Sequence, residues 1–169
     1  ERAETTYGRQ ITLSLSPGGW VASTHVDFLH GVSQMWRISD DLWDRWEDIY
    51  QQFPRLARWV PMQRTGHWAD ADMLPLGHIG LRAERGDDRQ SKLTCDEQKT
   101  LLTLWSMGRS PLMVGGDLPT SSADTIALLA NPALREVTAG SSDNREIIRE
   151  RLFAEWNVEE SFIGELIVW

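Results

Sequence analysis

The chain has 169 residues, the size of about one domain, and its 41% hydrophobic and 25% charged residues are typical of a globular protein and exclude a disordered tail. Acidic side chains outnumber basic ones by 25 to 17, and the resulting net charge of −8 repels phosphate backbones, which argues against a nucleic-acid partner. The single cysteine, Cys95, cannot form a disulfide within the chain, and no apolar run approaches the roughly 20 residues that a membrane helix needs.

Two strands and a helix are predicted in the first third of the chain. Apolar and polar residues alternate strictly over 10–16, which predicts a strand that a Pro-Gly-Gly sequence ends. A second short strand is predicted over 35–39. Over 40–53 the apolar residues recur at intervals of three and four, which predicts an amphipathic helix that Pro54 bends or interrupts.

The middle of the chain continues the alternation of strands and helices. The segment 66–74 is short and bounded by Gly and Pro, and residues 112–114 are predicted to form another short strand. Capping boxes at 94–97 and 121–124 predict the starts of two helices, and the Asn-Pro pair at 131–132 ends the second. Strand and helix therefore alternate four times, which predicts parallel βα units and an α/β fold class.

The pattern changes from about residue 141. A polar segment over 141–145 leads to a predicted helix over 147–156, and strands are predicted over 162–163 and 166–169. We therefore expect a new domain to begin here. The chain has no initiating methionine or signal-type segment and stops inside an apolar run, so we expect it to be a piece of a longer protein.

Polar side chains recur at the carboxyl ends of the predicted strands. In a parallel βα architecture these ends face the ligand crevice, and carboxylates there suit acid/base chemistry on a polyhydroxylated substrate or a cation site. The side chains concerned are Ser14 and Ser16, Arg37 with Asp40 and Asp41, Asp70 with Asp72, and Asp117.

Structural interpretations compete with the functional ones. Asp40 and Asp41 also fit a helix cap, worth about 0.5 to 2 kcal/mol. Asp70 and Asp72 share one face of an extended segment, but Ca²⁺ takes about six oxygen ligands and this segment offers few more, so a structural or sugar-contacting role is expected. The histidines have neither the spacing nor the neighbouring cysteines of a zinc site, and no metal is expected.

The nine tryptophans are several times the usual number for such a length. Tryptophan side chains either fill cores or stack on ligands such as sugar rings. Trp43 and Trp46 follow helical spacing and are predicted to lie in the core. Trp36 and Trp68 lie at predicted strand ends and are predicted to stack on a ligand.

Four motifs, in their order and spacing, resemble glycoside hydrolase family 27, which contains the α-galactosidases and α-N-acetylgalactosaminidases. They occupy residues 8–18, 35–41, 66–74 and 109–117. The resemblance implies that residues 1–140 are the C-terminal half of a (β/α)₈ TIM barrel, with strands five to eight. It implies that residues 141–169 begin a C-terminal β-sandwich, and that the N-terminal half of the barrel is missing from this chain.

The resemblance also implies retaining hydrolysis by two carboxylic acids. The general acid/base of the family is the Asp four residues after the Arg of a Trp-Arg motif, which is Asp41 here. Arg37 would bind substrate hydroxyls, and Asp72 matches the sugar-contacting second Asp of an Asp-x-Asp segment. The family nucleophile ends strand four, which would precede Glu1, so no residue of this chain is assigned that role. No cofactor or metal is implied.

The resemblance does not identify the sugar. Many α-galactosidases have a Glu near the site that recognises the 2-hydroxyl, whereas this chain has Ser16 there. The substrate implied first is a terminal α-D-galactoside. An α-N-acetylgalactosaminide, a β-L-arabinopyranoside and a non-catalytic carbohydrate-binding role are the alternatives. The resemblance favours a secreted or periplasmic protein over a cytoplasmic one.

Overall fold

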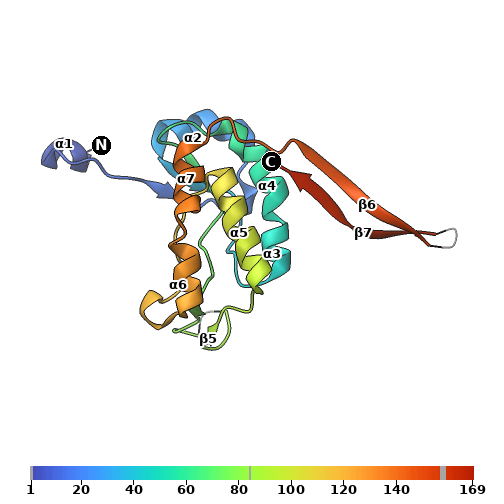
Figure 1. The fold of residues 1–169 in the computed structure, drawn as a ribbon. Coiled ribbons are helices and arrows are strands. Elements are labelled where there is room, and N and C mark those ends of the chain that lie inside the picture. Colours follow the sequence, from blue (N-terminus) through green and yellow to red (C-terminus); the bar gives the residue numbers. More distant parts are fainter. Residues whose placement is uncertain (1, 84, 157–158) are drawn as a thin grey trace.

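A parallel sheet forms the centre of the computed structural model, which describes residues 2–83, 85–156 and 159–169 (Figure 1). Its strands, in spatial order, are β1 (Ser14–Leu15), β2 (Met35–Arg37) and β3 (Trp68–Asp70). Leu74 and Val114 form a further parallel bridge beyond β3. The prediction of an α/β chain with parallel strands is therefore confirmed, although three of the strands are shorter than expected and the strand predicted over 112–114 is reduced to this bridge.

Helices lie beside this sheet, and two arms leave the molecule on opposite sides (Figure 1). The α-helices are α1 (Arg2–Tyr7), α2 (Val26–Val32), α3 (Trp46–Tyr50), α4 (Gln52–Trp59), α5 (Cys95–Gly108), α6 (Ala123–Leu129) and α7 (Pro132–Gly140), and the 3₁₀ turns are Gly18–Trp20, Ser23–His25, Val60–Met62 and Leu118–Thr120. One arm ends in α1. The other is an antiparallel hairpin of β6 (Ile148–Trp156) and β7 (Glu159–Val168). A smaller antiparallel hairpin joins β4 (His78–Ile79) to β5 (Arg89–Gln90).

The core lies between the sheet and helices α4 and α5. Trp36 of β2, Trp59 of α4 and Trp105 of α5 are each at most 2% exposed. The two helices approach closely because α5 ends in a glycine: a Cβ at Gly108 would lie 3.0 Å from a methyl group of Leu56. This packing fixes α4 and α5 behind the strands whose ends carry the polar side chains.

Helix α5 begins at the capping box that the sequence predicts. The Thr94 hydroxyl accepts a hydrogen bond from the Glu97 amide at 3.3 Å, and the Glu97 carboxylate accepts one from the Thr94 amide at 2.7 Å. The second capping box is displaced by one residue. Ser122 caps α6 by accepting from the Thr125 amide, because the hydroxyl of Ser121 donates to the Asp117 carbonyl.

Three further sequence predictions differ from the structure. The Asn-Pro pair also begins a helix, since the Asn131 side chain caps α7 and proline suits the first helical position. The helix predicted over 40–53 begins only at Trp46, and Pro54 lies in the first turn of α4, where no amide donor is needed. Residues 148–156, predicted as helical, form β6 because pairing along its length with β7 overrides the local preference. The strands predicted over 162–163 and 166–169 are parts of one strand, β7, which ends at Val168.

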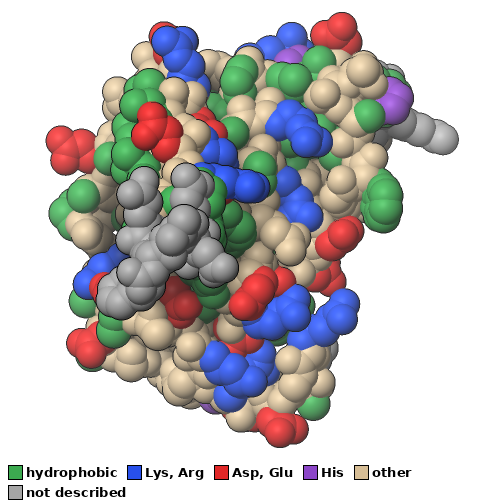
Figure 2. Space-filling model, turned by 90° about the vertical axis from the view of Figure 1, so that its right-hand side faces the viewer, with side chains coloured by type: hydrophobic (Ala, Val, Ile, Leu, Met, Phe, Trp, Pro, Cys, Tyr) green, Lys and Arg blue, Asp and Glu red, His purple; other side chains and the backbone are tan. Residues whose placement is uncertain are grey.

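Charged side chains of both signs are interspersed on the face shown in Figure 2. Within the described residues, no helix is both long and apolar enough to cross a membrane.

Candidate active site

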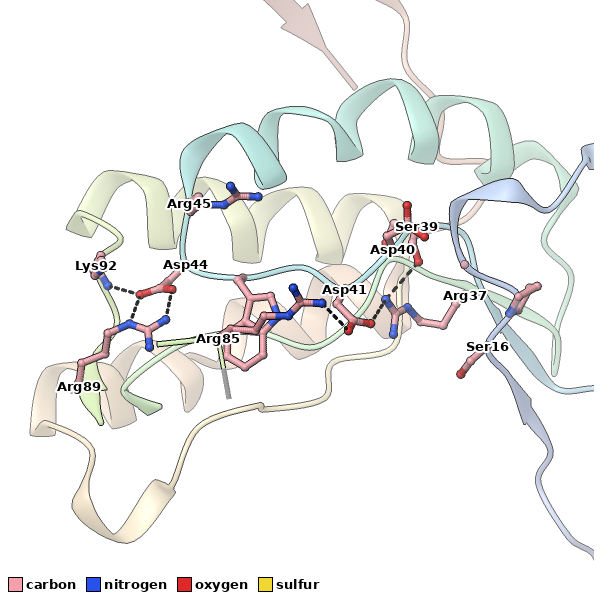
Figure 3. A pocket seen from close by; sticks show the side chains of 13 residues that line it. Ser16, Arg37, Ser39, Asp40, Asp41, Asp44, Arg45, Arg85, Arg89 and Lys92 are labelled. Carbon is pink, nitrogen blue, oxygen red and sulfur yellow. Dashed lines mark hydrogen bonds and ion pairs between the residues drawn. The ribbon is translucent and has the colours of Figure 1, made fainter. Parts of the chain in front are cut away.

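A pocket of about 760 Å³ opens at the carboxyl ends of β1 and β2 (Figure 3). Its lining residues are Ser16, Pro17, Gly18, Arg37, Ser39, Asp40, Asp41, Trp43, Asp44, Arg45, Arg85, Arg89 and Lys92. Ser16 directly follows β1 and Arg37 ends β2, so the strand ends bring together side chains that lie about twenty residues apart in the sequence. Four members of the group expected from the sequence are not in this lining. Ser14 is exposed, Asp70 and Asp72 are buried, and Asp117 accepts a hydrogen bond from the Thr120 hydroxyl in its own turn.

An ion pair joins Arg37, at the end of β2, to Asp72, two residues after the end of β3. The Arg37 guanidinium lies 2.7 Å from the Asp72 carboxylate, and these side chains are only 14% and 11% exposed. The same Arg37 nitrogen donates to the Ser39 carbonyl at 3.1 Å and to the Asp41 carboxylate at 3.5 Å. The structure therefore places Arg37, Asp41 and Asp72 in one cluster.

Asp72 is held by its backbone as well as by its carboxylate. Its φ of 88° is in the left-handed region, which Asp tolerates better than most residues. Its carboxylate accepts from the amides of Leu42 at 2.6 Å and Met73 at 2.7 Å, and its carbonyl accepts from the Trp105 indole at 3.0 Å. Burial raises the pKa of Asp72 above its ordinary value, although these amides and Arg37 favour the carboxylate.

Asp41 is the exposed carboxylate of the cluster. Its side chain is 62% exposed and lies between two arginines, 3.5 Å from Arg37 and 3.9 Å from Arg85. Its neighbour Asp40 turns the other way and accepts from the Gly19 amide at 3.2 Å. The helix-cap interpretation of this acidic pair is wrong, because α3 begins only at Trp46 and no side chain caps it.

The two tryptophans predicted to stack on a ligand do not reach this pocket. Trp36 is completely buried, because it points to the opposite face of β2 from Arg37 and packs against the ring of Trp59, 6.0 Å away. Trp68 begins β3, at the end of the strand away from the pocket, and the Arg109 guanidinium lies over its ring at 4.6 Å. The sugar-stacking prediction is therefore wrong for Trp36, and Trp68 is not in the lining of this pocket.

Four further residues line the pocket although their sequence context does not indicate a site. Trp43, predicted to be a core residue of a helix, lies in the loop before α3 and lines the pocket. Arg85 and Arg89 come from the β4–β5 hairpin, and Lys92 follows it. Charged residues are frequent over 85–92 in the sequence, but no local pattern indicated which strand end they would face.

Metal-ligand geometry is not found in the described residues, since they contain no group of three His, Cys, Asp or Glu side chains arranged to hold an ion. The cluster instead combines an exposed carboxylate with a buried ion pair. The carboxylate can exchange a proton with a bound molecule, and the ion pair can accept and donate hydrogen bonds to hydroxyl groups.

Replacing Asp70 tests how a buried carboxylate next to the cluster affects the stability of the protein. Its carboxylate is buried and accepts from the Asp72 amide at 2.9 Å, and burial raises the pKa of Asp70 above 3.8. A raised native pKa means that the charge costs stability, so the free energy of unfolding falls as pH rises from the unfolded-state pKa through the native one. Asp70→Asn keeps an acceptor without the charge.

We expect Asp70→Asn to leave the protein at neutral pH as stable as the wild type or more so, and to reduce the decline in stability as pH rises through the acid range. Urea unfolding of both proteins between about pH 4 and 7 measures this. A variant that loses stability more steeply than the wild type over this range would show that the charge of Asp70 is stabilising instead.

Known proteins resemble this chain over most of its length. The family model described as alpha galactosidase A matches residues 2–143. A GH27 β-L-arabinopyranosidase from Geobacillus stearothermophilus has a similar structure, with 43% sequence identity and a TM-score of 0.83 over 89% of this chain and 35% of that chain. Alpha-galactosidase 2 of Arabidopsis thaliana is 27% identical over 96% of this chain and 35% of its own length.

Human alpha-N-acetylgalactosaminidase is 28% identical over 77% of this chain and 31% of its own length. The chain therefore spans about a third of the length of the relatives that it matches.

Proposed function

Because the chain belongs to glycoside hydrolase family 27, we propose that the full-length protein hydrolyses a terminal glycoside with retention of configuration and that Asp41 is its general acid/base. The observation that carries the proposal is the position of Asp41, four residues after Arg37, exposed in the pocket and beside the Arg37–Asp72 pair. A carboxyl group so placed can protonate the glycosidic oxygen of a bound sugar and then activate water.

The remaining roles follow from this assignment. A retaining mechanism needs a second carboxylate about 5 Å from the first. We assign this nucleophile to a part of the full-length protein that lies outside these 169 residues. Arg37, which lines the pocket, and Asp72, which is paired with it at 2.7 Å, hold hydroxyl groups of the sugar. Ser16 leaves space near the 2-position because its side chain is short.

The barrel assignment is part of the same proposal. Residues 1–140 form the C-terminal half of a (β/α)₈ barrel, and the β6–β7 hairpin within 141–169 begins a β-sandwich. Apolar side chains at both edges of the parallel sheet support a larger barrel: Ile11 and Leu13 are 53% and 43% exposed on one edge, and Met113 and Val114 are 46% and 38% exposed on the other. Neighbouring strands at both edges would bury these side chains.

Terminal β-L-arabinopyranosides are the proposed substrates. The 43% identity to the β-L-arabinopyranosidase supports them over the α-D-galactosides that the sequence motifs first suggested. The two sugars have the same ring configuration and differ in the hydroxymethyl group that galactose carries on C5. A group of this size changes transition-state binding by about 1–3 kcal/mol, or roughly 10- to 200-fold.

We expect kcat/KM for nitrophenyl β-L-arabinopyranoside to exceed that for nitrophenyl α-D-galactoside by at least about tenfold, which corresponds to about 1.4 kcal/mol. The full-length protein is assayed on both substrates and on nitrophenyl α-N-acetylgalactosaminide. A tenfold preference for the galactoside would instead support the relation to alpha-galactosidase 2. Binding of all three sugars without turnover would support a non-catalytic carbohydrate-binding role and contradict the proposal.

A further inference from the structure

The loop over residues 40–45 carries Asp41 but belongs to no helix or strand. Side chains therefore have to fix its path, and three carboxylates do so. The Leu42 amide donates to Asp72 at 2.6 Å, and the Trp43 amide donates to Asp48 of α3 at 3.2 Å. The third carboxylate is Asp44 of the loop itself, which points toward the β4–β5 hairpin (Figure 3).

Asp44 and Arg89 form a two-pronged ion pair across 45 positions of sequence. Arg89 Nε lies 3.0 Å from one oxygen of Asp44 and Nη2 lies 2.5 Å from the other, and the side chains are only 3% and 14% exposed. The Lys92 amide donates to the same carboxylate at 3.0 Å. Burial disfavours the charged form of Asp44, but the hydrogen bonds from Arg89 and Lys92 outweigh it and hold the pKa of Asp44 below its ordinary value.

The hairpin that carries Arg89 is itself tightly folded. Ile79 pairs with Arg89 across the hairpin, and Arg89 also donates to the Asp87 carbonyl at 3.0 Å. Gly80 has a φ of 76°, and a Cβ there would lie 2.6 Å from that carbonyl oxygen, so the close approach requires glycine. The hairpin is therefore a defined support on which Arg89 holds the loop.

We propose that Arg89 is a positioning residue for the acid/base: through Asp44 it fixes the loop so that the Asp41 carboxylate faces the glycosidic oxygen. This inference rests on the proposed function of Asp41. The same hairpin brings Arg85 to 3.9 Å from Asp41, so the hairpin contacts the loop at both the buried and the exposed end. Because a displacement of about 1 Å costs roughly 100-fold in rate, loss of this support reduces proton donation without removing Asp41.

The test separates proton donation from folding by varying the leaving group. In the full-length protein, Arg89→Gln should lower kcat/KM for an alkyl β-L-arabinopyranoside by about 10- to 100-fold, and for the dinitrophenyl glycoside by less than about threefold, because that leaving group needs no proton. Arg89→Lys keeps the positive charge but loses the planar guanidinium that makes two parallel hydrogen bonds. Its kcat/KM for the alkyl glycoside should lie between those of Arg89→Gln and the wild type.

Two further variants control for stability. Arg149 forms a comparable two-pronged pair with Glu146, at 2.9 and 2.5 Å, on β6 outside the pocket lining. Arg149→Gln should therefore leave the ratio between the two substrates unchanged. If Arg89→Gln does not fold, Asp44→Asn combined with Arg89→Gln leaves no unpaired buried charge and should fold while showing the same dependence on the leaving group.

Equal losses on both substrates in the folded Arg89 variants, or the same shift in the ratio for Arg149→Gln, would overturn the inference. The outcome for Asp41→Asn separates this failure from failure of the proposed function. If Asp41→Asn shows the leaving-group dependence and the Arg89 variants do not, only the positioning role is wrong. If Asp41→Asn shows none either, the acid/base assignment is wrong.

Discussion

Asp41→Asn in the full-length protein is expected to lower kcat/KM for an alkyl β-L-arabinopyranoside by about 10²- to 10⁴-fold, the usual contribution of general acid catalysis. The value for a dinitrophenyl glycoside should change little, because this leaving group departs without a proton. The carboxylate of Asp41 is the exposed one in the cluster and lies 3.5 Å from Arg37 at the end of β2. Steady-state kinetics on the two substrates measure the difference.

Asp40→Asn is the matched control for this prediction. Asp40 is the adjacent carboxylate and lines the same pocket, but it accepts a hydrogen bond from the Gly19 amide at 3.2 Å and supports the turn after β1. We expect its replacement to change kcat/KM by less than about tenfold, and equally for both leaving groups. If Asp40→Asn costs as much as Asp41→Asn, or more, the acid/base has been assigned to the wrong residue.

Asp72→Asn should have the second largest effect, a loss of about 100-fold in kcat/KM on every substrate whatever its leaving group, or about 2.7 kcal/mol. Asp72 contacts Arg37 at 2.7 Å, and removing its charge leaves Arg37 nearly buried without its main partner. Asparagine adopts the left-handed backbone of residue 72 readily, so the loss reports the charge and not backbone strain.

Alanine at position 72 tests the backbone separately. Asp72→Ala should lose stability beyond Asp72→Asn, because a φ of 88° is unfavourable for alanine. Thermal unfolding of both variants measures this difference. A suitable charge control is Asp96→Asn, which removes an exposed ion pair with Lys99 on α5 and should not alter kinetics. If Asp72→Asn stays within about threefold of the wild type, Asp72 does not bind the sugar in the proposed way.

The sequence predicted the features that depend on local pattern. The capping box at Thr94 and the parallel order of three strands are confirmed. Arg37, Asp41 and Asp72 also lie together, as expected for residues at the carboxyl ends of neighbouring parallel strands. These predictions succeeded because alternation, capping and strand ends each leave a signal within a few residues.

The β4–β5 hairpin could not be predicted in the same way. Each of its strands has only two residues, and the ion pair that ties it to the site joins Asp44 to Arg89, 45 positions apart. No local spacing encodes such a contact. For the same reason, β6 was predicted as a helix, since only its pairing with β7 makes it a strand.

The tryptophans show why a strand-end position alone does not predict a contact with the ligand: neighbouring residues of a strand face opposite sides of the sheet. Trp36 and Arg37 are adjacent in β2, so their side chains point to opposite faces of the sheet. Arg37 faces the pocket and Trp36 is therefore buried against Trp59. Trp43 lines the pocket because α3 begins three residues after it, at Trp46.

Azide rescue of Asp41→Asn tests the central claim most directly, because it reports the acid/base position and the retaining mechanism together. Without the Asp41 carboxylate, a small anion can enter its place and attack the glycosyl-enzyme from the same face as water. With nitrophenyl β-L-arabinopyranoside and azide, NMR of the product should show β-L-arabinopyranosyl azide, of retained configuration, and turnover should rise with azide concentration. An azide product of inverted configuration, or turnover that azide does not increase, would contradict the account.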